Sequence, residues 1–216
     1  MNKNQIITKT INFVREKLIR ESSGHDWWHI ERVWKMAKFI ACQEKADLFI
    51  VELAALLHDI ADWKFNDDNV ALKISSDWLL NQNVDQDIIE KIIAIIKDVS
   101  FKGSKFNKKM QSKEGQIVQD ADRLDALGAI GIARCFAYGG FKGREIYNPD
   151  LSPQEYTSIK EFKQSNSSSI NHFYEKLFLL KDLMNTQTGI KIALKRHKFM
   201  QTFIGEFMKE WNGDKN

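Results

Sequence analysis

The sequence has few of the residues that interrupt helices and few that form disulfides. Its 216 residues include 2 prolines, 11 glycines and 2 cysteines. Because proline and glycine break regular helices and punctuate chains of short strands, their scarcity favours a fold of long helices. Cys42 and Cys135 lie in apolar helical contexts without a CxxC partner. We expect both to be small core residues, with no disulfide framework and no cysteine-based zinc site.

The sequence also lacks an apolar run long enough to cross a membrane. Residues 1–5 are not followed by the apolar core of a secretory signal. We therefore expect a cytoplasmic, soluble protein without a membrane partner.

Neither sign of charge dominates the chain. Lysine and arginine number 32 against 29 aspartates and glutamates, which gives a net charge of +3. Basic residues concentrate in 101–113 and 191–198, which we interpret as a solvated loop and a solvated helix face. This balance argues against a nucleic-acid partner, although a local basic stretch can attract an anionic substrate.

Apolar residues recur at helical spacing along most of the chain, and hydrophobic residues make up 43% of it. This pattern predicts an all-α, globular, non-repeating multi-helix bundle. The isoleucine-rich stretch 88–96 is assigned to a helix because of its period and its charged flanks. The predicted helices cover about 5–19, 26–44, 47–59, 71–79, 85–99, a long helix from 114 through 133 that stops at Gly139-Gly140, 170–184 and 188–211.

The predicted third helix contains the unbroken apolar run Leu53–Leu57, which is followed by His58 and Asp59. A helix that is apolar around most of its circumference should be central in the fold. Placing an imidazole and a carboxylate at its end is costly unless something pairs with them. A metal ion is the compensation that we expect, held at the helix end where both side chains can turn to one point.

Other segments offer further donors. Asp26 suits a helix N-cap, which places His29 in the first turn of its helix. Asp122 and Asp125 lie three residues apart on one helical face, so one can bind an ion while the other hydrogen-bonds a ligand or a water. A mixed nitrogen and oxygen site suits one divalent ion, Mn²⁺, Fe²⁺, Ni²⁺, Zn²⁺ or Mg²⁺, and leaves positions open for an acidified water and a substrate oxygen.

His29, the pair His58-Asp59 and Asp122 match the H…HD…D signature, and the chain resembles the HD-domain metal-dependent phosphohydrolase superfamily. Its segments are similar to those of a subgroup of small bacterial HD hydrolases, which includes nucleoside triphosphate pyrophosphohydrolases. The segments that carry the resemblance are 25–33, 54–64, 119–126, 136–140 and 171–177.

The resemblance implies an all-helical fold with one metal ion held by His29, His58, Asp59 and Asp122. It implies hydrolysis of phosphate esters or anhydrides, most of all of nucleotides, with (d)NTP cleaved to (d)NMP and pyrophosphate, often by a homodimer. We expect one domain over residues 1–216, with a metal-binding core at about 20–135 and helices at 136–216 that complete the pocket.

One further role, that of a general acid or base, follows from the same resemblance. Related alarmone hydrolases carry HDxxED; Asp62 matches the first acid of that pair and Trp63 stands at the second. Asp62 is the candidate general acid or base, and Asp125 supports catalysis beside the metal ligands. The chemistry of their side chains makes Lys64, Arg123 and His172 the candidate substrate-binding residues. The alternatives are a surface charge for Lys64 and Arg123 and a hydrogen-bonded core histidine for His172.

Three other interpretations stay open. A non-catalytic nucleotide or metal sensor could use the same fold. Such a sensor would bind nucleotides without releasing phosphate or pyrophosphate. An HD-type di-iron oxygenase would need ligands for a second metal, and the sequence has few spare histidines. A nucleic-acid-binding module rests on the lysine-rich stretch alone.

Of the remaining histidines, His25 either lines the pocket or precedes the helix cap, and His197 is expected on the surface.

Overall fold

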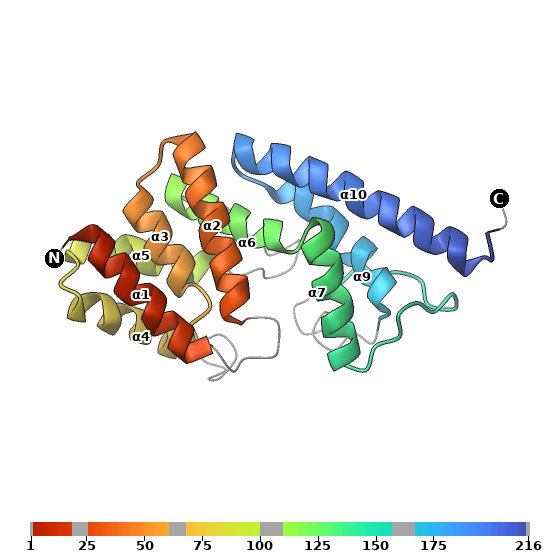
Figure 1. The fold of residues 1–216 in the computed structure, drawn as a ribbon, viewed down its shortest axis with the longest axis horizontal. Coiled ribbons are helices and arrows are strands. Elements are labelled where there is room, and N and C mark those ends of the chain that lie inside the picture. The colour runs from red at the N-terminus through yellow and green to blue at the C-terminus, as the bar shows by residue number, and fades with distance from the viewer. Residues whose placement is uncertain (1, 19–25, 61–67, 100–109, 157–166, 215–216) are drawn as a thin grey trace. The chain divides into compact units, whose positions relative to one another are not determined.

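The structure is a computed structural model that describes residues 2–18, 26–60, 68–99, 110–156 and 167–214. All regular elements in these residues are helical, which confirms the predicted all-α class (Figure 1). The elements are α1 (Lys3–Leu18), α2 (Trp27–Glu44), α3 (Leu48–Leu57), α4 (Asp68–Asn81), α5 (Gln86–Val99), α6 (Lys113–Asp125), α7 (Gly128–Phe141), α9 (Ser169–Glu175), the 3₁₀ helix η2 (Leu177–Leu183) and α10 (Gln187–Trp211).

The chain divides into two compact units. Unit 1 comprises Met1–Phe101 and Lys108–Asp122, and unit 2 comprises Lys102–Asn107 and Arg123–Asn216. Helix α6 therefore contributes its residues up to Asp122 to unit 1. The expected single domain over residues 1–216 stays a prediction.

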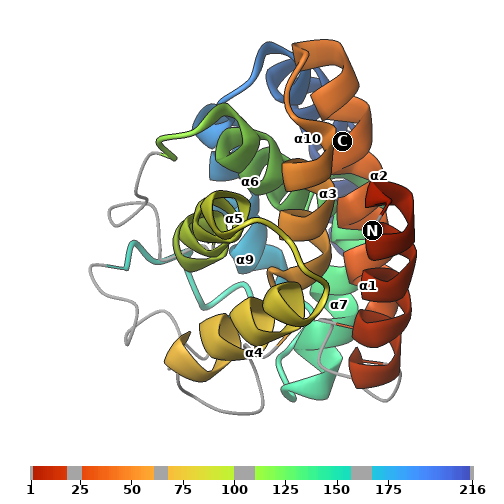
Figure 2. The ribbon, with the colours of Figure 1, turned by 90° about the vertical axis from the view of Figure 1, so that its left-hand side faces the viewer.

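Helix α3 is the centre of unit 1, as its apolar composition predicts. It packs against α1, α2 and α5 (Figure 2). Every residue from Phe49 to Leu57 is buried. The carboxylate of Glu52 interrupts this apolar surface, and it accepts a hydrogen bond from Trp34 Nε1 at 2.9 Å and pairs with Lys38 Nζ at 3.0 Å. The buried carboxylate of Glu52 therefore has polar partners. Helix α3 forms a rigid support for His58 and Asp59, which follow it.

Helix α5 confirms the helical assignment of the isoleucine-rich stretch. Ile89, Ile92, Ile95 and Ile96 are buried, at the spacing of one face of a helix. This face packs on α3 and α4. The isoleucines thus form the part of the core of unit 1 that lies against α3.

The long helix predicted from residue 114 to Gly139 is wrong, because the chain breaks between α6 and α7. Ala126 and Leu127 close α6 with short turn hydrogen bonds to Arg123 and Leu124. Leu127 is extended, and Gly128 then adopts a left-handed φ of 75°. A side chain at Gly128 would meet the Arg196 side chain at 3.0 Å, so glycine suits both the backbone angle and the close packing.

In unit 2, α7, α9, η2 and α10 pack together around aromatic side chains. Phe173 is fully buried and its ring lies 6.0 to 6.1 Å from those of Phe136, Phe178 and Phe203. The continuous helix predicted over 170–184 is wrong, because Lys176 leaves helical geometry with φ −140° and ψ −57°. The chain continues as the 3₁₀ helix η2.

Two further expectations are corrected. Cys42 is exposed, whereas Cys135 is half-buried, so only Cys135 approaches the core position expected for both. His197 is buried and packs edge to face against Phe178, with ring centroids 5.0 Å apart. Its basic neighbours in the sequence suggested a surface residue, but α10 turns this position toward the aromatic core of unit 2.

Among the helices that the structure describes, none has the length and apolar character that crossing a membrane requires.

Candidate metal centre

The first of four candidate metal-ligand donors, His29, lies in the first turn of α2. Asp26 adopts an extended backbone, and its Oδ1 accepts a hydrogen bond from the His29 backbone N–H at 2.9 Å. This cap satisfies one of the free backbone donors of the first turn and fixes the direction in which α2 begins. The His29 side chain is 1% exposed. The predicted N-cap therefore places a buried imidazole at a defined point.

Replacing Asp26 with alanine should destabilise the protein by about 1 kcal/mol, because the first turn of α2 loses its cap. The same variant should bind divalent metal ions more weakly, since His29 lies in that turn. Urea unfolding measures the stability, and calorimetric titration with Mn²⁺ measures the affinity. Asp26→Asn keeps an acceptor oxygen and should retain most of both properties. Equal losses in the two variants would contradict the cap argument.

The second and third donors come directly after α3. His58 is the C-cap of this helix, and its Nδ1 lies 2.8 Å from the backbone carbonyl of Ala55. Because a carbonyl oxygen only accepts, Nδ1 carries the proton and the Nε2 lone pair is left to bind a cation. Asp59 follows, and its side chain is 8% exposed. The relaxed helix end brings both neighbours to one point, as the sequence predicts.

The fourth donor, Asp122, lies near the end of α6. The start of this helix is attached to the connection between α2 and α3. Lys113 Nζ donates to the Glu44 carbonyl at 2.6 Å, and Glu114 Oε1 accepts from the Asp47 backbone N–H at 3.2 Å. These contacts align α6 with the two helices that carry the other donors. The Asp122 side chain is 26% exposed, so solvent reaches the cluster on this side.

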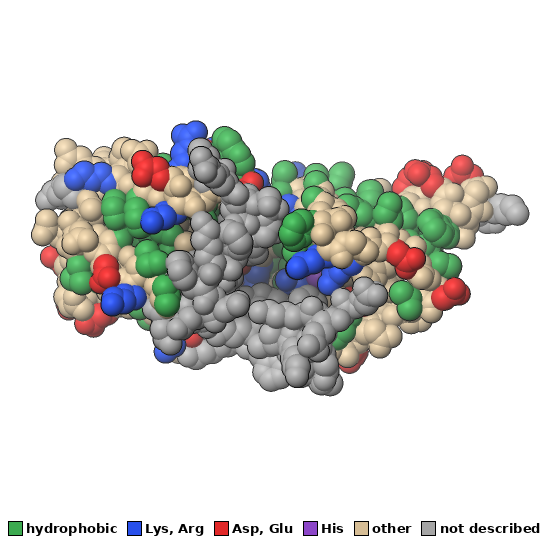
Figure 3. Space-filling view, turned by 90° about the horizontal axis from the view of Figure 1, so that it is seen from below, with side chains coloured by type: hydrophobic (Ala, Val, Ile, Leu, Met, Phe, Trp, Pro, Cys, Tyr) green, Lys and Arg blue, Asp and Glu red, His purple; other side chains and the backbone are tan. Residues whose placement is uncertain are grey.

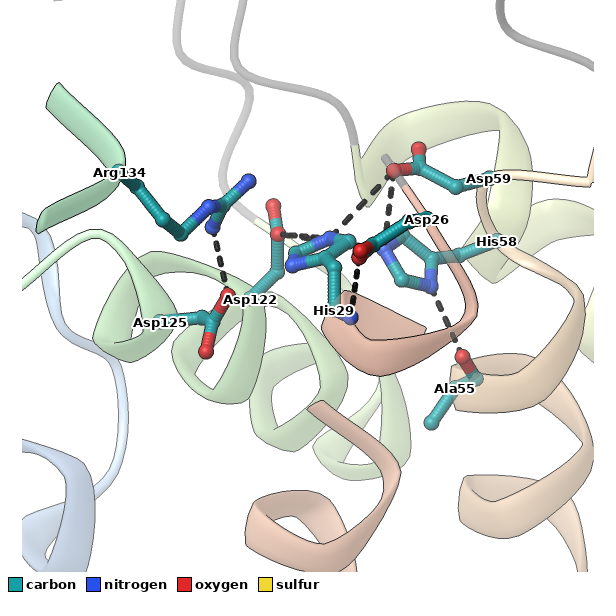
Figure 4. A network of polar contacts seen from close by, with 8 residues as sticks. All are labelled: Asp26, His29, Ala55, His58, Asp59, Asp122, Asp125 and Arg134. Carbon is teal, nitrogen blue, oxygen red and sulfur yellow. Dashed lines mark hydrogen bonds and ion pairs between the residues drawn. The ribbon is translucent and has the colours of Figure 1, made fainter. Parts of the chain in front are cut away.

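The four side chains converge on one point within unit 1 (Figure 4). Asp59 Oδ2 lies 3.4 Å from His29 Nε2 and 3.7 Å from His58 Nε2. Asp122 Oδ1 lies 3.5 Å and 3.9 Å from the same two nitrogens. Donors bound to one ion at about 2.1 Å stand about 3.0 to 3.4 Å apart at octahedral or tetrahedral angles. Small side-chain rotations therefore bring all four atoms onto one ion.

The chemistry of His58 Nε2 tests whether the cluster suits a metal ion. This atom is buried, and no hydrogen-bond partner lies within reach of it in the part of the chain that the structure describes. Its lone pair faces two carboxylate oxygens, which are also electron-rich. A cation between these atoms removes the repulsion and satisfies the buried nitrogen. The donor set therefore fits a divalent ion, and His29, His58 and Asp59 form a buried group that could hold one.

Asp125 and Arg123, which follow Asp122 on α6, have partners within unit 2. Asp125 is buried, and its Oδ2 lies 2.6 Å from Arg134 Nη1 (Figure 4). Arg123 is also buried and donates from Nη1 to the backbone carbonyl of Leu183. Both side chains thus support the packing of unit 2. Their predicted roles in catalysis and substrate binding stay predictions.

His172 lies on α9 in unit 2, outside the metal cluster. Burial, together with the positive charges of Lys176 and Arg144, lowers the pKa of its imidazole to about 3. The imidazole is therefore neutral at physiological pH and can donate or accept a hydrogen bond without carrying charge. The other predicted site residues, Asp62 and Lys64, lie outside the described residues, as does His25.

Comparison with known proteins agrees with this geometry. The profile of the HD domain family matches residues 27–127, which include all four donors. The Bacillus subtilis protein YpgQ is 43% identical over 204 residues, covering 93% of this chain and 91% of YpgQ. The chain belongs to the HD domain family. HD domains bind divalent metal ions, and the buried histidine and aspartate cluster described above lies inside the matched region.

Solved structures similar to this HD domain protein extend the match over nearly the whole chain. An HD-superfamily hydrolase of Bacillus thuringiensis is 47% identical, with 98% and 99% of the two chains covered and a TM-score of 0.79. A Lactobacillus plantarum protein is 40% identical, with 99% and 100% covered and a TM-score of 0.86. YpgQ in complex with ADP superposes with a TM-score of 0.73 and 38% identity, covering 97% of each chain. These neighbours support a metal-dependent hydrolase class.

Sequence reasoning missed two supporting groups of this HD domain. The Ala55 carbonyl, which selects the tautomer of His58, is a backbone atom, so no residue type could indicate it. Arg134, the partner of Asp125, lies nine residues further along the chain, beyond the break between α6 and α7. On the continuous helix that the sequence predicts, these two residues would be about 13.5 Å apart along the helix axis.

Proposed function

We propose that this chain is a metal-dependent phosphohydrolase that acts on nucleotides, cleaving (d)NTP to (d)NMP and pyrophosphate. The buried cluster of two imidazoles and two carboxylates carries this proposal, because its donors stand 3.4 to 3.9 Å apart. The HD-superfamily hydrolase of Bacillus thuringiensis supports the reaction class. The ADP complex of YpgQ supports nucleotides as the ligand class.

In this proposal His29, His58, Asp59 and Asp122 hold one divalent ion. The two carboxylates balance its double charge, while the two imidazoles bind as neutral ligands. The bound ion supplies Lewis-acid chemistry, which lowers the pKa of water and polarises a phosphoryl oxygen. Asp122, as the most exposed of the four, lies on the side where a phosphate group can approach. Water adds to the α-phosphorus, the bond from that phosphorus to the bridging oxygen breaks, and pyrophosphate leaves.

The remaining roles are proposals as well. Asp62 serves as the general acid or base, and Lys64 neutralises phosphate charge. Asp125 supports the reaction from its ion pair with Arg134, and Arg123 and His172 contribute to substrate binding. A homodimer in solution is likewise a proposal.

An Asp62→Asn variant separates the proton role from metal binding, because it should keep the ion and lose turnover.

A nucleotide panel with product analysis tests the proposal. The purified chain is incubated with Mn²⁺ and each of the ribo- and deoxyribonucleoside triphosphates, diphosphates and sugar phosphates, and anion-exchange chromatography resolves the products. We expect nucleoside monophosphate and pyrophosphate in equal amounts from at least one triphosphate, and no turnover with EDTA. Release of orthophosphate alone would contradict the proposed bond. Nucleotide binding without any product would favour the sensor instead.

A further inference from the structure

The last turn of α6 is held by three other elements of unit 2. Arg134 on α7 pairs through its Nη1 with Asp125 Oδ2 at 2.6 Å. Arg196 on α10 donates from its Nη1 to the backbone carbonyl of Leu124. Arg123 reaches the end of η2 through the carbonyl contact described above. Three consecutive residues at the end of α6 are thus each bound to a different element.

Two glycines let the chain between α6 and α7 pack closely against Arg196. An added Cβ at Gly128 would lie 3.0 Å from Arg196 Cγ. A Cβ at Gly131, in the first turn of α7, would lie 2.2 Å from the carbonyl oxygen of Ala126. The aliphatic part of Arg196 is therefore held against this connection, which places its guanidinium at the end of α6.

The end of α6 concentrates negative charge. The C-terminal end of a helix carries a partial negative charge from its free carbonyl groups. Three of the last six residues of α6 are also aspartates, namely Asp120, Asp122 and Asp125. Negative side chains at this end of a helix destabilise its last turn. The guanidinium groups of Arg134 and Arg196 bring compensating positive charge from outside the helix.

Asp122 immediately precedes the three residues that are held in this way. Figure 4 shows its side chain pointing toward His29, whereas Asp125 points toward Arg134. A side chain on a helix leaves the backbone in a direction that the helical geometry defines. Asp122 is also the most exposed of the four metal-ligand donors, with 26% of its side chain exposed. Its direction therefore depends on the last turn of α6 more than on surrounding side chains.

The connection between the two arginines and Asp122 runs through α6 alone. Arg134 and Arg196 contact residues of unit 2, and Asp122 is the last residue of unit 1. Helix α6 continues across this boundary to Asp125. An effect of the arginines on Asp122 therefore requires no contact between the two units.

We propose that Arg134 and Arg196 are positioning residues, which hold the last turn of α6 and thereby direct the carboxylate of Asp122 toward the metal ion. This inference rests on the metal-ligand role of Asp122 in the proposed function. Neither arginine touches the ion or the substrate. Loss of either guanidinium lets the last turn fray, so Asp122 binds the ion with poorer geometry while the three buried donors stay in place.

Titration of the full chain with Co²⁺ tests this role, because the visible absorption of bound Co²⁺ depends on its ligands and their geometry. Arg134→Gln and Arg196→Gln should each weaken Co²⁺ binding by about tenfold, as when a metal ligand loses its support. Their absorption bands should shift toward those of Asp122→Ala. Arg134→Lys keeps the ion pair with Asp125 and should recover part of the affinity.

Controls separate this effect from surface charge and from stability. Figure 3 shows lysine and arginine side chains at several separate places on the surface. Lys195→Gln removes an exposed charge next to Arg196 in the sequence, and Arg15→Gln removes one from α1; both should bind Co²⁺ as the wild type does. Leu53→Ala should lower stability and leave the Co²⁺ spectrum unchanged. Thermal unfolding verifies that every variant is folded.

A double-mutant cycle shows whether the arginines act through Asp122. Asp122→Ala keeps the three buried donors, and water can replace the missing carboxylate. Adding Arg196→Gln to Asp122→Ala should change the Co²⁺ affinity by less than about twofold, against about tenfold in the wild-type background. An equal loss in both backgrounds would overturn the inference, because Arg196 would then act on the ion by another route.

The result is distinguishable from failure of the proposed function. Wild-type Co²⁺ affinity and absorption in both glutamine variants would overturn the inference, even if the chain hydrolyses nucleotides. Weakened Co²⁺ binding in both variants of a chain that hydrolyses no nucleotide would overturn the proposed reaction instead, and the positioning role of the two arginines would stand.

Discussion

Replacing Asp59 with alanine should lower the proposed nucleotide hydrolysis by at least about a thousandfold and abolish binding of the divalent ion. The reason is the central place of its carboxylate, whose Oδ2 lies 3.4 Å from His29 Nε2 and 3.7 Å from His58 Nε2. Without it, one negative charge and one donor are lost from a site that needs two carboxylates to balance a divalent ion.

Two measurements check this expectation. Steady-state assays with Mn²⁺ give the loss of turnover, and thermal unfolding with and without Mn²⁺ gives the loss of binding, because an ion that binds only the folded protein raises its unfolding temperature. The matched control Asp77→Ala removes an exposed carboxylate from α4 and should behave as the wild type. Substantial Mn²⁺-dependent activity in a folded Asp59→Ala protein would contradict the assignment of the site.

Replacing Leu53 with alanine should reduce the free energy of unfolding by about 3 kcal/mol. Leu53 is fully buried in α3, and α3 packs against three helices of unit 1. Removing the methine carbon and the two methyl carbons of this side chain leaves a cavity that close-packed neighbours fill only partly. Equilibrium unfolding in urea measures the change.

The same helix provides a control for this prediction. Leu48, in the first turn of α3, is 37% exposed, so Leu48→Ala should cost much less than Leu53→Ala. If the main role of α3 is to support His58 and Asp59, folded Leu53→Ala protein should still bind Mn²⁺, whereas Asp59→Ala protein should not. Similar losses of stability at the two leucines would show that α3 is not the centre of the core.

The parts of the fold that local chemistry determines could be predicted from the sequence. Asp26 and Asp47 cap α2 and α3 because their carboxylates accept from backbone N–H groups two or three residues away. The isoleucine face of α5 follows from spacing within a few turns. His58 and Asp59 were singled out because their position after a buried run is costly, and this reasoning also uses only neighbouring residues.

The parts that depend on distant contacts could not be predicted. The break at Gly128 is supported by packing against Arg196, 68 positions further along by their residue numbers. Asp122 and Asp125 share one helical face, so their spacing alone leaves open which one joins the metal cluster, and only the resemblance to HD hydrolases implies Asp122. The structure separates them, because Asp122 lies beside His29 and His58 while Asp125 pairs with Arg134.

The measurement that tests the central claim most directly is anomalous scattering from crystals of the protein grown with Mn²⁺. We expect one strong peak per chain, at about 2.0 to 2.3 Å from His29 Nε2, His58 Nε2, Asp59 Oδ2 and Asp122 Oδ1. Elemental analysis of the same preparation should give one manganese per chain. A peak away from these four atoms, or no peak among them at saturating Mn²⁺, would contradict the account.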